Sequence, residues 1–223
     1  MRKILITGAT RGIGKAICAE LAADTHILVG GRNAEAVANL VAQLPCASPF
    51  VADLLSEDEV TKACAEISEL DGLVLNAGIG FAKTVADTTR AEWTEMLLTN
   101  VVAQADLTRQ LLPALRATRG QVVAINSGAG FNAGPGWAAY SASKFAFRAF
   151  TDSLREEERG KIRVSSVHPG RVDTDMQIAL QESFGRAYNP ADHLRPESVA
   201  KAVRAVLDAT PEACLETVSV RPA

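Results

Sequence analysis

A tyrosine and a lysine four residues apart, in the segment Tyr140-Ser-Ala-Ser-Lys144, are the first residues that could do chemistry. On a helix this spacing places both side chains on one face. The positive charge of the lysine favours the phenolate, so it is expected to lower the pKa of the phenol. Such a phenol could exchange a proton with a substrate oxygen near neutral pH. The pair is common by chance, and taken alone it more often marks an exposed helical pair.

A glycine-rich turn near the N-terminus could bind a phosphate. Lys3–Thr7 predicts a short strand, and the turn with Gly8, Gly12 and Gly14 leads from it into a helical pattern. Glycines let the backbone approach a pyrophosphate, and the unpaired N–H groups at the helix start point at that negative charge. A glycine turn can also be mere chain geometry. Its position between a strand and a helix favours a nucleotide site.

The end of the next predicted strand, His26–Gly30, indicates which dinucleotide the glycine turn would bind. In dinucleotide folds an acidic residue about 20 positions after the glycines holds the ribose 2′-hydroxyl of NAD. Here Gly31 and Arg32 occupy that corner, and Asp24 lies at the wrong end of the strand. Glycine leaves room for a 2′-phosphate, which Arg32 could meet with its planar donors, and Arg11 could converge on the same group. Both arginines could instead be solvated loop residues; the missing acid favours NADP.

Strand and helix patterns alternate along all 223 residues. This alternation predicts an α/β fold: a single-domain Rossmann fold over residues 1–223, with a doubly wound parallel sheet of about seven strands and helices on both faces. Further strands are expected at Ser48–Ala52, Gly72–Leu75, Gly120–Asn126, Ile162–Val167 and Leu215–Val220. Further helices are expected at Ala34–Leu44, Glu57–Leu70, within Thr89–Ala117, from Tyr140 to about Arg159, and from Pro196.

Polar residues at the ends of these strands are candidate site residues, because ligands of such sheets bind at the carboxyl ends of the strands. Asp53 and Asn76 occupy such positions, although either could be a cap or a turn residue. Asn100 falls inside a predicted helix, where asparagine has a poor propensity, so it is either an interior amide or a functional residue. His168 has no acid spaced to partner it, which favours a structural or backbone-bonding role.

Composition argues against several other classes. The net charge of −3 without a basic block gives no indication of nucleic acid or an anionic membrane as partner. The apolar run at the start is too short for a signal peptide, and no stretch approaches a membrane span. The four cysteines are scattered, which is typical of a reducing compartment and not of metal ligands or disulfides. A cytoplasmic protein without a metal site is therefore expected.

Taken together, the motifs resemble those of the short-chain dehydrogenase/reductase family over essentially the whole chain. In chain order they are Thr7-Gly8-x-x-x-Gly12-x-Gly14, Asp53-Leu54, Asn76-Ala77-Gly78, Asn100-Val101, Ser127, Tyr140-x-x-x-Lys144 and Pro169-Gly170. Each motif is common, but seven in order at suitable separations are specific, and they make a chance pairing of Tyr140 and Lys144 remote.

The resemblance implies hydride transfer between a nicotinamide cofactor and a carbonyl or alcohol. Tyr140 would be the general acid in reduction and the base in oxidation, and Ser127 would polarise the substrate oxygen. Lys144 would bind the nicotinamide ribose and, with the positive ring, depress the pKa of Tyr140. Asn100 would hold a water that links Lys144 to solvent. The hydride chemistry itself belongs to the cofactor.

The resemblance also assigns binding residues. The NADP(H) site would contain Gly8, Thr10, Arg11, Gly12, Ile13, Gly14, Arg32, Asp53, Leu54, Asn76, Ala77, Gly78, Tyr140, Lys144, Val167, Pro169, Gly170, Val172 and Thr174. The substrate would contact Ser127, Tyr140, Phe81, Trp137, Met176, Leu180 and Phe184, which suggests an apolar, aromatic or alicyclic carbonyl compound. A short flexible lid is expected at about residues 171–195.

The chain also departs from the family pattern. Ala103 stands where many members have glycine, which concerns helix packing, and the lid and C-terminal end are abbreviated. A more open substrate site is expected, with a homodimer or homotetramer formed through the long helices near Asn100 and after Tyr140. An NADP-sensing binding protein without turnover is an alternative, although a sensor needs no complete catalytic set. An epimerase or dehydratase fits poorly, because such relatives carry a larger substrate domain.

Overall fold

The core of the molecule is one sheet of seven parallel strands, in the order β3-β2-β1-β4-β5-β6-β7. This computed structural model describes residues 1–183, 185 and 187–223. The strands are β1 Arg2–Ile6, β2 Thr25–Gly31, β3 Ala47–Val51, β4 Gly72–Leu75, β5 Gln121–Ile125, β6 Arg163–Pro169 and β7 Thr217–Val220. The predicted doubly wound α/β fold is confirmed.

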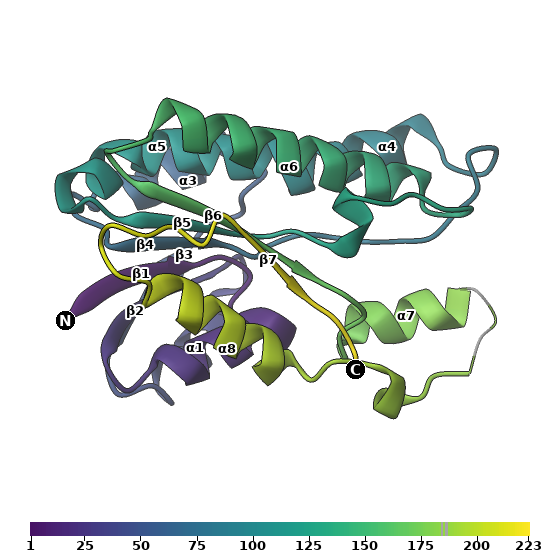
Figure 1. The fold of residues 1–223 in the computed structure, drawn as a ribbon, viewed down its shortest axis with the longest axis horizontal. Helices are drawn as coiled ribbons and strands as arrows, with labels where there is room; N and C mark the ends of the chain where they lie inside the picture. The colour runs from purple at the N-terminus through teal and green to yellow at the C-terminus, as the bar shows by residue number, and fades with distance from the viewer. Residues whose placement is uncertain (184, 186) are drawn as a thin grey trace.

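Helices cover both faces of the sheet, as Figure 1 shows. They are α1 Gly12–Leu21, α2 Ala34–Val41, α3 Glu57–Cys64, α4 Arg90–Leu97, α5 Ala103–Thr118, α6 Ala138–Glu157, α7 Asp175–Ser183 and α8 Pro196–Leu207. Helices α1, α2 and α8 pack on one face, and α3, α5 and α6 pack on the other. Because both faces are covered, the central strands β1 and β4 contain continuous apolar runs, and Ile4, Leu5 and Ile6 of β1 are all fully buried.

The winding direction of the chain reverses between β1 and β4. The chain runs from β1 outward through β2 to β3, returns to pair β4 with β1, and then continues outward through β5, β6 and β7. The carboxyl ends of β1 and β4 therefore diverge into loops on opposite sides, which opens a crevice for a ligand. Thr7 and Asn76, the residues that follow these two strands, lie at this point.

Three segments differ from the sequence-based expectation. The helix expected to reach Leu70 ends at Cys64, because the chain must leave the helix to bury Leu70, whose N–H donates to the Ala114 carbonyl at 3.2 Å. The long helix expected within 89–117 is interrupted by a π-helical segment at Leu98–Val102. The segment expected as a flexible lid contains the helix α7, whose Leu180 is buried.

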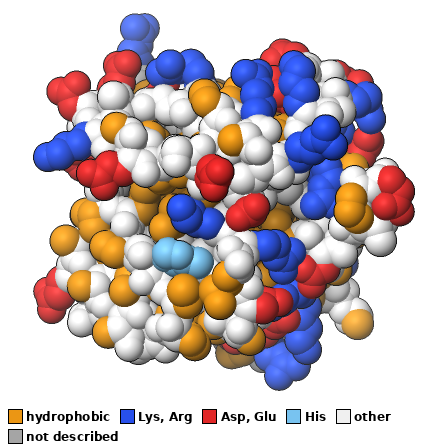
Figure 2. Space-filling model, turned by 90° about the vertical axis from the view of Figure 1, so that its left-hand side faces the viewer, with side chains coloured by type: hydrophobic (Ala, Val, Ile, Leu, Met, Phe, Trp, Pro, Cys, Tyr) orange, Lys and Arg blue, Asp and Glu red, His pale blue; other side chains and the backbone are white. Residues whose placement is uncertain are grey.

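The surface carries interspersed charges of both signs. Figure 2 shows acidic and basic side chains mixed across one side of the molecule. Within the described residues, no helix is long and apolar enough to cross a membrane. Those residues also contain no cluster of three or more His, Cys, Asp or Glu side chains suited to a metal ion.

Candidate active site

Helix α6 presents Tyr140 and Lys144 toward the carboxyl ends of the central strands. The Lys144 Nζ lies 5.8 Å from the centre of the Tyr140 ring and donates a hydrogen bond to the Ile125 carbonyl at 3.2 Å. Ile125 is the last residue of β5, so this bond joins the helix to the end of the sheet. Lys144 is only 8% exposed, and burial lowers its pKa to about 8.

Ser127 lies beside Tyr140 at the end of β5. Its backbone is held from behind by the buried His168, whose Nδ1 bonds to the Ser127 carbonyl at 3.0 Å. Its Oγ accepts a hydrogen bond from the Ala129 N–H at 3.1 Å, which leaves the hydroxyl hydrogen free to donate. Ser127 and Tyr140 line the same pocket, and the Ser127 hydroxyl acts to lower the pKa of the Tyr140 phenol, as expected for a donor that stabilises the phenolate. The structural role predicted for His168 is confirmed.

The pKa of Tyr140 differs from the sequence-based expectation. Burial raises the pKa of this phenol, and the hydrogen bond from Ser127 opposes that rise only in part. The expected lowering by Lys144 does not act on the phenol in the chain by itself, where burial and Ser127 alone shift the Tyr140 pKa. Lowering the Tyr140 pKa therefore requires a further positive charge in the site.

Asn100 lies in the π-helical segment and is 1% exposed. Its Oδ1 accepts from the Ile79 N–H at 2.8 Å, and its Nδ2 donates to the Ile79 carbonyl at 2.9 Å and to Ser143 Oγ at 3.0 Å. These bonds tie the loop after β4 to α6, one residue from Lys144. The structure thus gives Asn100 the interior-amide role; its part in a water relay stays a prediction. π-Helical turns occur frequently at functional sites.

The glycine turn after β1 is locked by Thr7 and Asn76. The Asn76 Nδ2 donates to the carbonyls of Thr7 at 2.9 Å and Gly8 at 3.1 Å, and Thr7 Oγ1 accepts from the Asn76 and Ala77 N–H groups. Gly8 has a φ of +60°, a region that favours glycine. A Cβ atom on Gly14 would lie 2.3 Å from the Gly8 carbonyl oxygen, so the close approach of α1 to the turn requires glycine there.

This turn borders a pocket of about 430 Å³. Of the predicted cofactor residues, the pocket is lined by Gly8, Thr10, Arg11, Gly12, Ile13, Arg32, Asp53, Leu54, Asn76, Ala77, Gly78, Tyr140, Lys144 and Thr174. Gly14 is buried under the turn and does not line the pocket. Pro169, Gly170 and Val172 line the adjoining second pocket instead, and Val167 is buried in the sheet. The sequence-based set therefore converges largely on one cavity.

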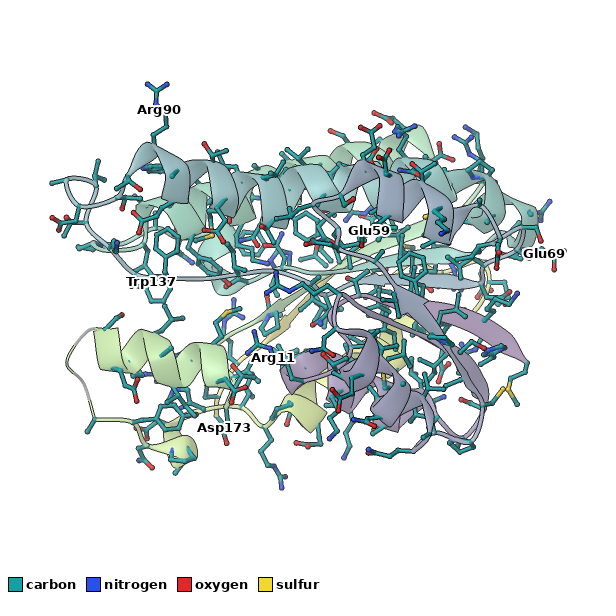
Figure 3. All side chains as sticks on the ribbon, turned by 180° about the vertical axis from the view of Figure 1, so that it is seen from behind. Arg11, Glu59, Glu69, Arg90, Trp137 and Asp173 are labelled. Carbon is teal, nitrogen blue, oxygen red and sulfur yellow. The ribbon has the colours of Figure 1, made fainter. Side chains whose placement is uncertain are left out.

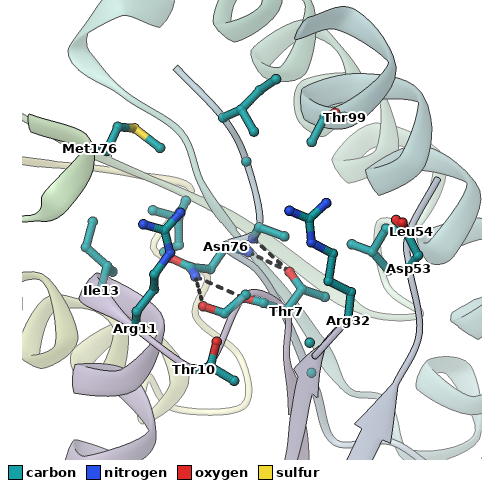
Figure 4. Close-up of a pocket in the computed structure, with 18 of the residues that line it drawn as sticks. Thr7, Thr10, Arg11, Ile13, Arg32, Asp53, Leu54, Asn76, Thr99 and Met176 are labelled. Atoms are coloured by element: carbon teal, nitrogen blue, oxygen red, sulfur yellow. Dashed lines mark hydrogen bonds between the residues drawn. The ribbon is translucent and has the colours of Figure 1, made fainter. Parts of the chain in front are cut away.

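The charged residues of this pocket lie on both sides of Asn76, as Figure 4 shows. Arg32 is exposed and forms no ion pair with any described residue. Arg11 was expected to converge with Arg32, but it pairs instead with Asp175 at 3.4 Å, because the start of α7 brings a carboxylate near. The Asp53 carboxylate accepts from the Leu55 N–H at 3.0 Å, so this residue both shapes a turn and lines the pocket.

The chain's own groups fit a dinucleotide in this pocket. Helix α1 has no acidic residue in its first turn and no side chain that caps its first N–H groups. These free donors at a helix start, beside glycines that admit close approach, suit a pyrophosphate. Ala52, the first residue after β3, and Leu54 supply apolar surface beside Asp53, as an adenine ring requires. Lys144 and Tyr140 mark the far end, where a nicotinamide ribose would lie.

A second pocket of about 480 Å³ adjoins the first and contains Ser127. Ile13, Asn126, Tyr140, Thr174 and Met176 line both, so the two form one continuous cleft. Trp137 lies over Tyr140 with ring centres 5.7 Å apart, and Figure 3 shows it at the end of α6 that faces α7.

Three predicted substrate residues, Trp137, Met176 and Leu180, line this pocket. Phe81 is half-buried and lines neither pocket. Phe184 lies outside the described residues.

Several lining residues were not among the predicted site residues. Asn126 is 4% exposed, lines both pockets, and its amide has no hydrogen-bond partner among the described residues. Arg171 and Arg221 also line the second pocket. A strand-end position could have indicated Asn126. Arg221 follows β7, far from the other site residues in sequence, and only the pairing of β7 with β6 brings it near Ser127.

Comparisons with known proteins agree with this geometry. The family model described as short chain dehydrogenase matches residues 2–184. The chain is 37% identical to dehydrogenase/reductase SDR family member 7B of Xenopus laevis, over 90% of this chain and 69% of that protein. It is 36% identical to a 3-oxoacyl-(acyl-carrier-protein) reductase of Aquifex aeolicus, over 89% and 87% of the two chains.

Solved structures are similar over the whole fold. An alcohol dehydrogenase from Thermococcus sibiricus complexed with 5-hydroxy-NADP superposes with a TM-score of 0.91 at 25% identity, covering 100% of this chain and 97% of that one. A 3-oxoacyl-(acyl-carrier-protein) reductase from Brucella melitensis with bound NAD has a TM-score of 0.84 at 28% identity, covering 99% and 90%. Similar structures thus hold either form of the cofactor.

Proposed function

Because the chain belongs to the short-chain dehydrogenase family, we propose that it is an NADP(H)-dependent oxidoreductase acting on a carbonyl compound or secondary alcohol. The observation that carries the proposal is the position of Tyr140 at the junction of the two pockets, with the Lys144 Nζ 5.8 Å from its ring centre and Ser127 lining the second pocket beside it. The substrate would have an apolar, aromatic or alicyclic part, supported by Trp137, Met176 and Leu180.

In the direction of reduction, the reaction converts a carbonyl, NADPH and a proton into an alcohol and NADP⁺. A nicotinamide held beside Tyr140 and Lys144 would supply the hydride, with its two electrons, to the carbonyl carbon. Tyr140 supplies the proton to the oxygen and regains one from solvent. Ser127 would donate a hydrogen bond to the same oxygen, since the bond from the Ala129 N–H uses an acceptor lone pair and leaves the hydroxyl hydrogen available. Oxidation reverses these steps, with Tyr140 as base.

Lys144 and Asn100 act on Tyr140 through position and charge. The bond to Ile125 holds the lysine close to the ring. Asn100 fixes Ser143 next to it on α6. A ribose at the end of the first pocket would accept hydrogen bonds from the Lys144 ammonium and favour its charged form. That cation, together with the positive ring of the oxidised cofactor, would offset the rise in the Tyr140 pKa caused by burial.

A panel of ketones, aldehydes and alcohols, followed by NADPH absorbance, tests this function. The protein contains two tyrosines, so Tyr188→Phe is a matched control for Tyr140→Phe. We expect Tyr140→Phe to reduce kcat by roughly 10³-fold, in line with the loss of a general acid, with cofactor affinity retained. Tyr188 lines neither pocket, and its variant should keep turnover. NADPH binding without oxidation by any compound, in an intact protein, would favour a cofactor sensor instead.

The preference for NADP rests on residues of this chain. The end of β2 presents Gly31 and Arg32 to the pocket with no carboxylate, and the Arg32 guanidinium has no ion-pair partner among the described side chains. Arg32→Asp should lower kcat/KM with NADPH relative to NADH by about tenfold or more, since it replaces a phosphate donor with a like charge. Arg90→Asp, the same charge change on the outer side of α4, is the control. Equal use of both cofactors by the unaltered protein would contradict the preference.

We also propose that the protein forms a homodimer or homotetramer through α4, α5 and α6. Leu98, Val102 and Phe145 are exposed apolar side chains on adjoining elements, a pattern that marks contact surfaces. Val102→Glu should lower the molar mass measured by light scattering, whereas Val85→Glu, at an exposed loop valine, should not. An unaltered mass with Val102→Glu would place the contact elsewhere.

We also propose that the protein is located in the cytoplasm. It is supported by four free cysteines, since thiols persist in a reducing compartment. Fractionation of cells that express the tagged protein tests it, and recovery in a membrane or secreted fraction would overturn it.

A further inference from the structure

Among the described residues, two positive side chains and no negative one line the second pocket. Arg171 and Arg221 are its only charged lining residues among those that the structure describes, and both are exposed at its mouth. The pocket also contains Ser127 and Tyr140, so any compound bound for reaction there is close to both guanidinium groups. An apolar ketone leaves this charge unused.

The Arg221 guanidinium is held in place by the backbone. One nitrogen, Nη1, donates to the carbonyls of His168 and Val220. The other, Nη2, lies 3.4 Å from where a Cβ atom of Gly128 would be, and Gly128 directly follows Ser127. The group is therefore oriented before any ligand binds, and Nη2 keeps its hydrogens for an acceptor beside Ser127. Preorganised donors of this kind bind carboxylate or phosphate at a small entropic cost.

Arg171 also lines the pocket, in the segment between β6 and α7. Its backbone is fixed, because its carbonyl accepts from the Leu194 N–H at 2.9 Å. The acidic residues nearest to it in sequence have other partners: Asp173 accepts from the Tyr188 hydroxyl, and Asp175 pairs with Arg11. Neither Arg171 nor Arg221 forms an ion pair within the described part of the chain. Their charges are thus left for a ligand.

From these observations we propose that the substrate is an anionic carbonyl compound or its alcohol, whose carboxylate or phosphate binds Arg221 and Arg171. This assignment rests on the proposed oxidoreductase function and specifies its substrate class. The oxygen to be reduced would lie between Ser127 and Tyr140, the anionic group at the arginines, and a short apolar part against Trp137 and Met176. The reaction is the balanced carbonyl reduction given above, and the anionic group keeps its charge throughout.

Matched pairs of compounds test the assignment with the NADPH-loaded protein. Acetoacetate and 4-oxopentanoate are compared with their methyl esters, and dihydroxyacetone phosphate with dihydroxyacetone. We expect kcat/KM for the anion to exceed that for its neutral partner by about tenfold or more, and this ratio to fall as salt rises, because the arginines are exposed. The carboxylate and phosphate pairs show which of the two anions the site takes.

Variants then show which arginine supplies the positive charge that binds the anionic group of the substrate. Arg221→Gln should lower the anion-to-neutral ratio by about tenfold, Arg171→Gln by less, and Arg221→Lys should restore part of it. Arg90→Gln removes one exposed arginine far from the pocket; in Figure 3 Arg90 points away from the fold. It should leave the ratio unchanged. Because the readout is a ratio within one protein, partial misfolding does not imitate the effect.

The outcomes separate the two proposals. Turnover with equal efficiency for acids and esters, or a ratio insensitive to Arg221→Gln, overturns the anionic substrate and leaves the oxidoreductase intact. Absence of turnover with every compound counts against the oxidoreductase. In that case calorimetric titration with 4-oxopentanoate and its methyl ester still decides the anion site: tighter binding of the acid, lost in Arg221→Gln, supports it, and equal or absent binding rejects it.

Discussion

The two pockets of the cleft are built in different ways. The walls of the first come largely from loops that follow consecutive strands of the N-terminal half, and backbone contacts among Thr7, Gly8 and Asn76 hold its centre. The second is assembled from segments far apart in the chain, around Ser127, Arg171 and Arg221, and its side chains define it. A backbone-built site tolerates little change, whereas a side-chain-built site can change its ligand while the fold persists.

Glycine substitutions make the sharpest test of this contrast. A Cβ on Gly14 would lie 2.3 Å from the Gly8 oxygen and 2.6 Å from Asn76 Nδ2, whereas one on Gly134 would meet only Trp137, at 3.9 Å. We expect Gly14→Ala to lower the free energy of unfolding by roughly 3 kcal/mol through overpacking and to weaken NADPH binding about 100-fold. Gly134→Ala should change either quantity little. Denaturation and fluorescence titration measure both, and equal effects would refute the distinction.

Lys144, at the junction of the pockets, is expected to lower the stability of the folded protein while it supports turnover. Its folded-state pKa of about 8 lies below its unfolded value of 10.5. Below pH 8 the lysine is charged in both states and the burial cost is fully present. As pH rises from 8 to 10.5 the folded state loses its proton first, so this cost disappears. Lys144→Met should therefore stabilise the cofactor-free protein by about 2 kcal/mol at pH 7, after allowing for the lost bond to Ile125.

The stability gain of Lys144→Met should shrink above pH 8, and the variant should lose turnover. Urea denaturation at pH 7 and pH 10 measures the first, and NADPH oxidation the second. Lys161→Met, on an exposed lysine after α6, serves as the control. A gain that does not depend on pH would show that burial does not perturb the Lys144 ammonium.

A smaller effect is expected from the amide that locks the glycine turn. Asn76→Ala removes the donor to the Thr7 and Gly8 carbonyls and should lower the free energy of unfolding by roughly 1 to 2 kcal/mol. Asn132→Ala, at an exposed position of the second pocket, should cost less than about 0.5 kcal/mol. Thermal unfolding of both variants provides the comparison. If Asn132→Ala cost as much, the second pocket would be as rigidly built as the first.

The sequence by itself determined the fold and most of the first pocket. Strands β1, β2, β4 and β5 contain short apolar runs between turn residues. A parallel sheet buried on both faces requires such runs, so the order of elements could be predicted. The glycine turn, Asn76 and the Gly31-Arg32 corner follow their strands directly. Their positions at one edge of the sheet follow from topology alone, because the carboxyl ends of parallel strands share an edge.

The tertiary structure alone decided the second pocket and the protonation of the site. Arg221 lies beside Gly128, the residue after Ser127, because β7 pairs with β6. Phe81 lines neither pocket, and Arg11 pairs with Asp175. Burial raises the pKa of Tyr140 and lowers that of Lys144. For Tyr140 this is the opposite of the lowered pKa that its spacing from Lys144 on a helix predicted. Burial and long-range pairing depend on segments distant in the chain, and local residue patterns do not encode them.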